Sequence, residues 1–209
     1  MKKQEKIRVL IVDDHYIVRM GLISVVDTEP DMEVVAEADD GDRALELYAK
    51  HHPDLVLLDL RMPGKNGIHT ATEIRAKFPS ARILMLSAFS GSEDIHRAIQ
   101  AGVQGYVLKS SSGENLIPAL RAVAAGQRWI TKEIVTQLDS RKSTEELTTR
   151  EVQVLNQLAR GLANKTIADI LNISEYTVKD HLKHILFKLR VADRTEAVTT
   201  AIQRGIIHI

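Results

Sequence analysis

Five polar residues stand directly after short apolar runs in the first half of the sequence: Asp13, Asp14, Asp59, Ser87 and Lys109. Three carboxylates that gather at one place repel one another, so they usually hold a hard cation, for which Mg²⁺ is the natural candidate. A carboxylate can also accept a phosphoryl group, whose charge is then neutralised by a metal ion, an ammonium group and a hydroxyl donor. The set therefore predicts phosphoryl chemistry, although each aspartate alone could be a solvated loop acid.

The apolar runs before these residues predict the strands of one sheet. The runs are Ile7 to Val12, Met32 to Glu37, Leu55 to Leu58, Arg82 to Leu86 and Gly105 to Leu108. Continuous apolar runs that alternate with amphipathic stretches indicate parallel strands covered by helices on both faces. The predicted fold class is α/β, with a doubly wound five-stranded parallel sheet. Ligands of such sheets bind beyond the carboxyl ends of the strands, which is where the polar residues stand.

The strand pattern stops after about residue 125, and the remainder predicts an all-α domain. The expected helices are Leu147 to Arg160, Lys165 to Leu171, Glu175 to Leu189 and Asp193 to Arg204. The short turn between the second and third of these predicts a helix-turn-helix. The polar segment from Gln137 to Glu146 indicates an exposed linker.

Four residues have the side chains and positions of helix N-caps: Thr148, Asn164, Ser174 and Asp193. Each can accept a hydrogen bond from a free backbone N–H in the first turn of its helix. Thr148 and Glu151 together predict a capping box, in which each side chain bonds the other residue's backbone N–H.

The composition excludes several classes of protein. There is no cysteine, so disulfides and thiolate zinc sites are ruled out. The 28 Lys and Arg residues balance the 28 Asp and Glu residues, with a mild acidic excess before residue 125 and a mild basic excess after it. The charged N-terminus leads into an apolar run too short for a signal or transmembrane segment. We expect a soluble cytoplasmic protein whose second half favours an anionic partner.

Four segments of the first half resemble the receiver domain of bacterial two-component response regulators. They are Asp13-Asp14-His15, Asp59 to Gly64, Ser87-Ala88 and Gly105 to Lys109. The resemblance covers roughly residues 6 to 125 and implies a flavodoxin-like fold. It also implies that a sensor histidine kinase phosphorylates Asp59, and that Mg²⁺ is held by Asp13, Asp14, Asp59 and the backbone carbonyl of Arg61.

Further roles follow from the same resemblance. Ser87 and Tyr106 would form the conformational switch pair, and Lys109 would contact the phosphoryl group. An aromatic beside the last strand could instead be a packing residue. Lys109 is followed by Ser110, where many receivers have proline, so no cis peptide is expected there. As a hypothesis, the long side chain of Arg61 shields the acyl phosphate and slows its hydrolysis.

The second half resembles the LuxR-type helix-turn-helix. The resemblance lies in Leu147 to Glu151, Gly161 to Ala168, Ser174 to His181 and Lys188 to Ala197. With a receiver in front, the whole chain resembles a response regulator of the NarL/FixJ family. This family often has glycine at the position of Arg190, so the sequence does not predict the conformation of the turn before the last helix. The family also uses that last helix for dimerisation, although its apolar residues could belong only to the domain core.

The resemblance implies two groups of DNA contacts. Base edges would be read by Lys179, Asp180 and Lys183, whereas phosphates would be bound by Lys165, Thr177 and Arg194. Two exposed lysines on a helix could equally be a solvated face. An acid at position 180 can accept a hydrogen bond from cytosine N4, or it can pair with a neighbouring lysine.

We therefore predict a receiver domain at residues 1–125, a linker at 126–146 and a LuxR-type DNA-binding domain at 147–209. Phosphorylation of Asp59 would control sequence-specific DNA binding, either by unmasking the DNA-binding face or by making a homodimer. No enzymatic activity is expected beyond phosphoryl self-transfer and autodephosphorylation. One alternative is a Mg²⁺-dependent phosphohydrolase, which would need an acid where Arg61 stands. The other is a receiver that acts on protein partners without DNA.

Overall fold

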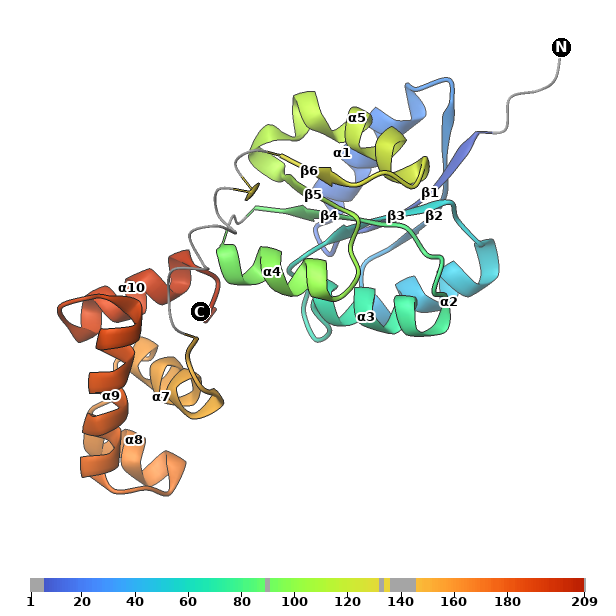
Figure 1. The fold of residues 1–209 in the computed structure, drawn as a ribbon. Helices are drawn as coiled ribbons and strands as arrows, with labels where there is room; N and C mark the ends of the chain where they lie inside the picture. The colour runs from blue at the N-terminus through green and yellow to red at the C-terminus, as the bar shows by residue number, and fades with distance from the viewer. Residues whose placement is uncertain (1–5, 89–90, 132–133, 136–145, 209) are drawn as a thin grey trace, which may run out of the picture. The chain divides into compact units, whose positions relative to one another are not determined.

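The computed structural model describes residues 6–88, 91–131, 134–135 and 146–208 (Figure 1). The chain divides into two compact units, one built on a sheet and the other built of helices. Each unit has its own cluster of buried apolar side chains. Most of the predicted linker lies outside the described residues. None of the described helices is long and apolar enough to cross a membrane.

The first unit is built on parallel strands. Within the described residues these are β1 (Ile7–Val12), β2 (Met32–Ala38), β3 (Leu55–Asp59), β4 (Ile83–Ser87), β5 (Gly105–Leu108) and β6 (Trp129–Ile130). Their order in the sheet is β2-β1-β3-β4-β5-β6. The predicted doubly wound parallel sheet is confirmed for its five strands, and β6 pairs with β5 to add a sixth. A strand of two residues is too short to produce a pattern in the sequence.

Helices cover both faces of this sheet. They are α1 (Tyr16–Asp27), α2 (Gly41–His51), α3 (Gly67–Lys77), α4 (Ser92–Gln100) and α5 (Ser112–Ala124), with a short 3₁₀ turn at Lys109–Ser111 before α5. Helices α1 and α5 lie on one face, and α2, α3 and α4 lie on the other (Figure 1). Every residue of β3 and β4 is buried as a result, which explains their continuous apolar sequences.

The second unit contains α7 (Thr149–Ala159), α8 (Asn164–Leu171), α9 (Glu175–Leu189) and α10 (Arg194–Gln203). Helix α9 packs against the other three, with Val178, Ile185 and Leu189 buried in the core. The three residues between α8 and α9 form the short connection that the sequence predicts for a helix-turn-helix.

Three of the four predicted N-caps are confirmed, and Asn164 is wrong. Thr148 forms both halves of the capping box, and the side chains of Ser174 and Asp193 accept hydrogen bonds from the first turns of α9 and α10. The N-cap of α8 is Ala163, which makes no side-chain hydrogen bond, because its extended backbone starts the helix one residue early. Asn164 is consequently the first residue inside α8.

The turn after α9 forms without glycine. Arg190 has φ 58° and ψ 50°, the left-handed conformation in which a helix commonly ends. This backbone costs a residue with a Cβ about 1–2 kcal/mol, which the surrounding structure must offset. Within the described residues no peptide bond is cis, including the one between Lys109 and Ser110.

Candidate functional site

Two buried aspartates and one lysine meet at the carboxyl ends of the strands. Asp13 follows β1, Asp59 ends β3 and Lys109 follows β5. The Lys109 Nζ lies 2.7 Å from Asp13 Oδ2 and 2.7 Å from Asp59 Oδ1. The Asp13 side chain is fully buried, and the Asp59 side chain is 5% exposed. The structure thus brings three of the predicted site residues into direct contact.

Burial and the neighbouring charges have opposite effects on the pKa values of Asp59 and Lys109. Burial raises the pKa of Asp59, and the hydrogen bond and positive charge of Lys109 offset this only in part. Burial also acts to lower the pKa of Lys109, but hydrogen bonds to Asp13 and Asp59 outweigh it, so that pKa is raised. The lysine is therefore a permanent cation beside two carboxylates.

The turn between β1 and α1 adds a third carboxylate. The backbone N–H of His15 donates to Asp13 Oδ1 at 2.9 Å, which fixes the turn. The Asp14 Oδ1 atom is buried and accepts no hydrogen bond from the described residues, although His15 Nδ1 lies 2.9 Å away. Ligand atoms of Asp13, Asp14 and His15 all lie within 4.8 Å of one another. His15 was not among the predicted site residues.

Arg19 in α1 stabilises this turn, and it was also not among the predicted site residues. Its Nη1 donates to the backbone carbonyl of Asp13 at 2.7 Å, and its Nε donates to Glu37 at the end of β2 at 2.8 Å. The side chain is only 12% exposed. The one signal in the sequence is a basic residue one turn into a helix that follows an acidic turn.

The loop between β3 and α3 is closed tightly around Asp59. The Asp59 Oδ2 atom accepts a hydrogen bond from the backbone N–H of Arg61 at 3.1 Å, and the N–H of Gly67 donates to the Leu60 carbonyl at 2.8 Å. A Cβ on Gly67 would lie 2.1 Å from the Asp59 carbonyl oxygen. Glycine is therefore required where α3 begins against the strand end.

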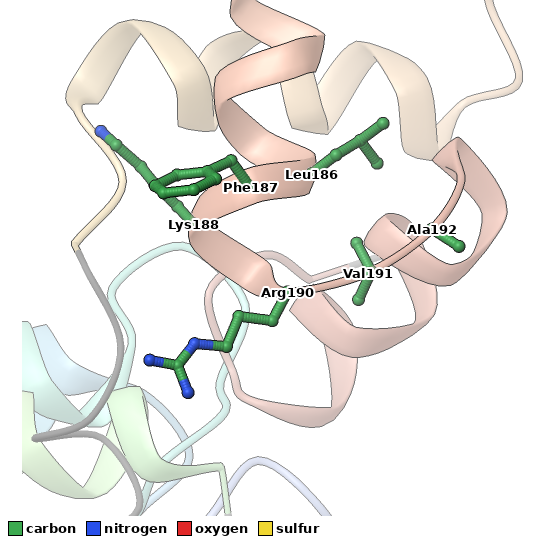
Figure 2. Close-up of a pocket in the computed structure, with 6 residues that line it drawn as sticks. All are labelled: Leu186, Phe187, Lys188, Arg190, Val191 and Ala192. Atoms are coloured by element: carbon green, nitrogen blue, oxygen red, sulfur yellow. The ribbon is translucent and has the colours of Figure 1, made fainter.

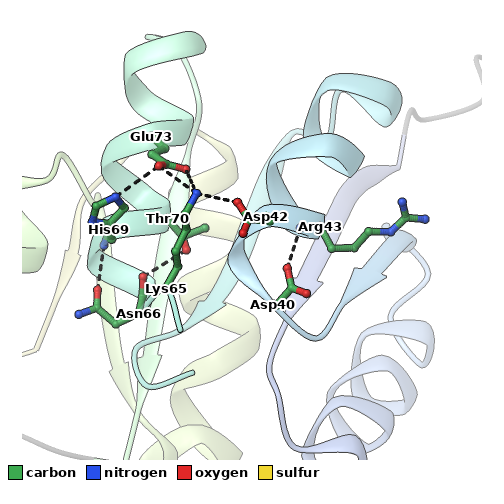
Figure 3. Close-up of polar contacts among 8 residues, drawn as sticks. All are labelled: Asp40, Asp42, Arg43, Lys65, Asn66, His69, Thr70 and Glu73. Atoms are coloured by element: carbon green, nitrogen blue, oxygen red, sulfur yellow. Dashed lines mark hydrogen bonds and ion pairs between the residues drawn. The ribbon is translucent and has the colours of Figure 1, made fainter. Parts of the chain in front are cut away.

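Lys65 fastens the tip of the same loop to two helices (Figure 3). Its Nζ lies 2.6 Å from Asp42 in α2 and 3.0 Å from Glu73 in α3. Glu73 also lies 3.3 Å from His69 Nε2. No sequence pattern predicts the contacts of Lys65, because Lys65, Asp42 and Glu73 come from separate elements.

Ser87 and Tyr106 are both buried, each with 1% of its surface exposed. Ser87 ends β4, and Tyr106 lies in the neighbouring strand β5. The inward position of Tyr106 fits the packing role in this conformation.

The exposed face of α9 carries the residues predicted to read bases. Lys179, Asp180 and Lys183 are all exposed, opposite the buried side of the helix. Lys179 Nζ lies 2.9 Å from Glu175, and Asp180 lies 4.0 Å from His184 rather than from a lysine. These pairs join exposed side chains, so they are weak and can open for a ligand.

The three residues predicted to contact DNA phosphates differ from one another in their surroundings. Lys165 is exposed at the start of α8. The Thr177 hydroxyl lies 2.8 Å from the Ser174 hydroxyl within the cap of α9. Arg194 donates from Nη2 to the Leu162 carbonyl at 2.9 Å, which ties α10 to the turn before α8.

A surface pocket with a volume of about 660 Å³ lies at the C-terminal end of α9 (Figure 2). Its lining residues are Leu186, Phe187, Lys188, Arg190, Val191 and Ala192. Phe187 is 72% exposed, whereas the Lys188 ammonium is 2.8 Å from the buried carboxylate of Glu151.

Comparison with known proteins gives matches to both units. The response regulator receiver domain family matches residues 9–121, and the family of bacterial regulatory proteins, luxR family, matches residues 145–201. The chain belongs to the response regulator family. It joins a receiver to a LuxR-type DNA-binding domain and controls transcription as a two-component response regulator.

Three similar proteins match this chain over nearly all of their length. The nitrate/nitrite response regulator protein NarL of Escherichia coli K12 is 39% identical, over 99% of this chain and 100% of that protein. The response regulator protein VraR of Staphylococcus aureus Mu3 is 37% identical, over 97% of this chain and 99% of that protein. A structure of RcsB from Salmonella enterica serovar Typhimurium, bound to promoter rprA with phosphomimetic BeF₃⁻, is 26% identical in sequence. It superposes with a TM-score of 0.69 and covers 95% of this chain and 99% of that one.

The residues of this receiver fit a divalent cation. Receiver domains typically bind Mg²⁺ at an acidic pocket, and here the Lys109 ammonium contacts Asp13 and Asp59, while Asp14 lies beside Asp13. Three carboxylates and one ammonium leave two negative charges, which one divalent cation would balance. The buried Asp14 oxygen without a hydrogen-bond partner among the described residues is an available ligand of the type that Mg²⁺ prefers.

Proposed function

We propose that Asp59 of this regulator accepts a phosphoryl group from a phosphohistidine of a sensor kinase. An Asp59 carboxylate oxygen attacks phosphorus, a P–O bond forms, and the P–N bond to the kinase imidazole breaks, returning neutral histidine once a proton is taken up. Water later cleaves the acyl phosphate and restores the carboxylate. The observation that carries the proposal is the Lys109 ammonium 2.7 Å from both Asp13 and Asp59.

The surrounding groups would stabilise the transferred phosphoryl group. Lys109 would exchange its contact with the Asp59 carboxylate for a phosphoryl oxygen, and the Ser87 hydroxyl would donate to a second. Asp13, Asp14, Asp59 and the Arg61 carbonyl would hold Mg²⁺, which supplies positive charge to the third oxygen. Movement of Ser87 toward the phosphate would change the space available to Tyr106.

The second half of the proposal concerns DNA. Helix α9 would enter the major groove with Lys179, Asp180 and Lys183 at base edges, while Lys165, Thr177 and Arg194 lie near phosphates. Double-stranded DNA as partner implies the cytoplasm. We assign the receiver to residues 1–125 together with β6 (Trp129–Ile130), which falls inside the predicted linker 126–146, and the DNA-binding domain to residues 147–209. Two copies bound as a homodimer would place their α9 helices about one DNA turn apart.

The test measures DNA affinity and phosphorylation together. Wild type, Asp59→Ala and the control Asp39→Ala, an exposed aspartate of the same domain, would be incubated with acetyl phosphate and Mg²⁺ and offered random duplexes for selection. We expect a hydroxylamine-sensitive phosphoprotein and stimulated, selective DNA binding from wild type and Asp39→Ala only. Phosphorylation of Asp59→Ala would contradict the assignment of the acceptor.

The same samples separate the remaining alternatives. A DNA affinity that falls with salt, with a logarithmic slope of about −0.9 for each phosphate contact, supports DNA as the partner. Absence of DNA binding would favour protein partners instead. Multiple turnover of a small phosphate ester would favour a phosphohydrolase. Gel filtration with and without acetyl phosphate then distinguishes dimerisation, which shifts the elution volume, from unmasking in a monomer.

A further inference from the structure

Tyr176 stands out on the surface of the second unit. It is 80% exposed, the highest value among the large apolar side chains of the described residues, in a chain with only 4% aromatic residues. Single exposed apolar side chains are common, so exposure alone assigns no role. The position of this tyrosine in α9 is what gives the exposure meaning.

Tyr176 is the second residue of α9 and lies opposite the buried side of the helix. Val178 and Ile185 are fully buried, whereas Tyr176 and Lys183, seven residues apart, lie on one exposed stripe. Side chains of a helix lean toward its N-terminus, so the Tyr176 ring is expected at the N-terminal end of α9, over its first turn. This turn is the part of a recognition helix that lies nearest the bases.

The apolar character of the ring, rather than the charges around it, favours a base over a phosphate as its contact. Glu175 precedes Tyr176, and Asp180 lies one turn further along the same face; both carboxylates are about half exposed. The ammonium of Lys179 lies 2.9 Å from Glu175, and Lys183 lies on the same exposed stripe, so these two positive charges balance the two acids and the ring itself is uncharged. An apolar ring in the major groove can instead pack against the C5-methyl group of thymine.

We propose that Tyr176 is a specificity-determining residue that packs its ring against the methyl group of one thymine in each DNA half-site. The inference rests on the proposed entry of α9 into the major groove. It adds an apolar reader to the charged side chains at positions 179, 180 and 183. The phenol hydroxyl is not required for the contact, because the recognised group is a methyl.

The experiment replaces each thymine of the selected duplex by uracil, which removes only the methyl group. Full-length wild type is expected to lose about fourfold in affinity at one thymine of each half-site, the value of one buried methyl. Tyr176→Phe should keep this discrimination, and Tyr176→Ala should bind the thymine and uracil duplexes equally. Phe187→Ala, at another exposed aromatic of α9, is the matched control and should discriminate like wild type.

Three results would overturn the proposal. Equal binding of all uracil duplexes by wild type would show that no methyl is read. Unchanged discrimination by Tyr176→Ala would place the contact elsewhere, and its loss in Tyr176→Phe would assign it to the hydroxyl. Failure of wild type to bind any duplex is a separate result, because it refutes DNA binding itself.

Discussion

The guanidinium of Arg19 holds the backbone carbonyl of Asp13 at 2.7 Å and the carboxylate of Glu37 at 2.8 Å, and so ties the acidic turn to β2. Groups that orient metal ligands commonly contribute a factor of about ten or more to metal affinity. Arg19→Met should therefore weaken Mg²⁺ binding about tenfold, measured by calorimetry on the full-length protein. Phosphorylation at saturating Mg²⁺ should fall much less.

Arg43 provides the control for this prediction. It forms an ion pair of the same kind with Glu46 at 2.8 Å, but both side chains are more than half exposed. Arg43→Met should leave Mg²⁺ affinity unchanged, while Glu37→Gln should show part of the Arg19→Met effect. Equal Mg²⁺ affinity of wild type and Arg19→Met would refute a positioning role for Arg19.

Gly67 offers a test of how closely the loop packs against Asp59, the proposed phosphoacceptor. The Cβ of Gly67→Ala would lie 2.1 Å from the Asp59 backbone oxygen, so α3 would have to move. We expect a loss of about 2 kcal/mol in the free energy of unfolding and slower phosphorylation.

The comparison is Gly21→Ala in α1, where an added Cβ would meet nothing within 4 Å. Alanine is the better helix former, so this change should stabilise the protein by up to about 1 kcal/mol without altering phosphorylation. Urea unfolding and a phosphorylation time course measure both effects. A Gly67→Ala protein as stable and as active as Gly21→Ala would show that the loop adapts at no cost.

The acidic site was predictable because topology does most of the positioning. Lys109 and Asp13 are 96 residues apart, yet parallel strands bring their carboxyl ends to one edge of the sheet. The apolar runs identified these strands because β3 and β4 are buried on both faces. The helices of the second unit were predictable for the corresponding reason, since their buried faces repeat with helical period.

The parts that the sequence did not predict depend on single side chains or very short elements. Arg19 and Lys65 find partners on other elements, and no period relates such residues along the chain. Asn164 has the side chain of an N-cap, but the backbone of Ala163 starts the helix before it. Arg190 takes the left-handed conformation without glycine, and its backbone N–H then bonds the carbonyls of Leu186 and Phe187 at the helix end, so these hydrogen bonds outweigh its local preference.

Glu151 links the capping box of α7 to α9 and makes the stability of the second unit depend on pH. Its carboxylate, 4% exposed, accepts from the backbone N–H of Thr148 at 2.7 Å and from Lys188 Nζ at 2.8 Å. Burial alone would raise the pKa of Glu151, but the hydrogen bonds from Lys188 and Thr148 outweigh it, so that pKa is lowered. The group therefore contributes stability above its unfolded pKa, and this is lost as pH falls through its folded pKa.

Glu151→Gln should lower the free energy of unfolding by about 1–2 kcal/mol at neutral pH, because Lys188 loses its counterion and the cap is weakened. Below about pH 4 the difference from wild type should shrink as Glu151 becomes protonated. Urea unfolding of the full chain, monitored by hydrogen exchange in α7 and α9, measures the free energy of unfolding at neutral pH and at low pH. Glu175→Gln, which breaks an exposed pair with Lys179, should cost less than about 0.5 kcal/mol. A Glu151→Gln deficit that stayed constant across this pH range would mean that the charge of Glu151 contributes nothing, and that only the shape of the cap matters.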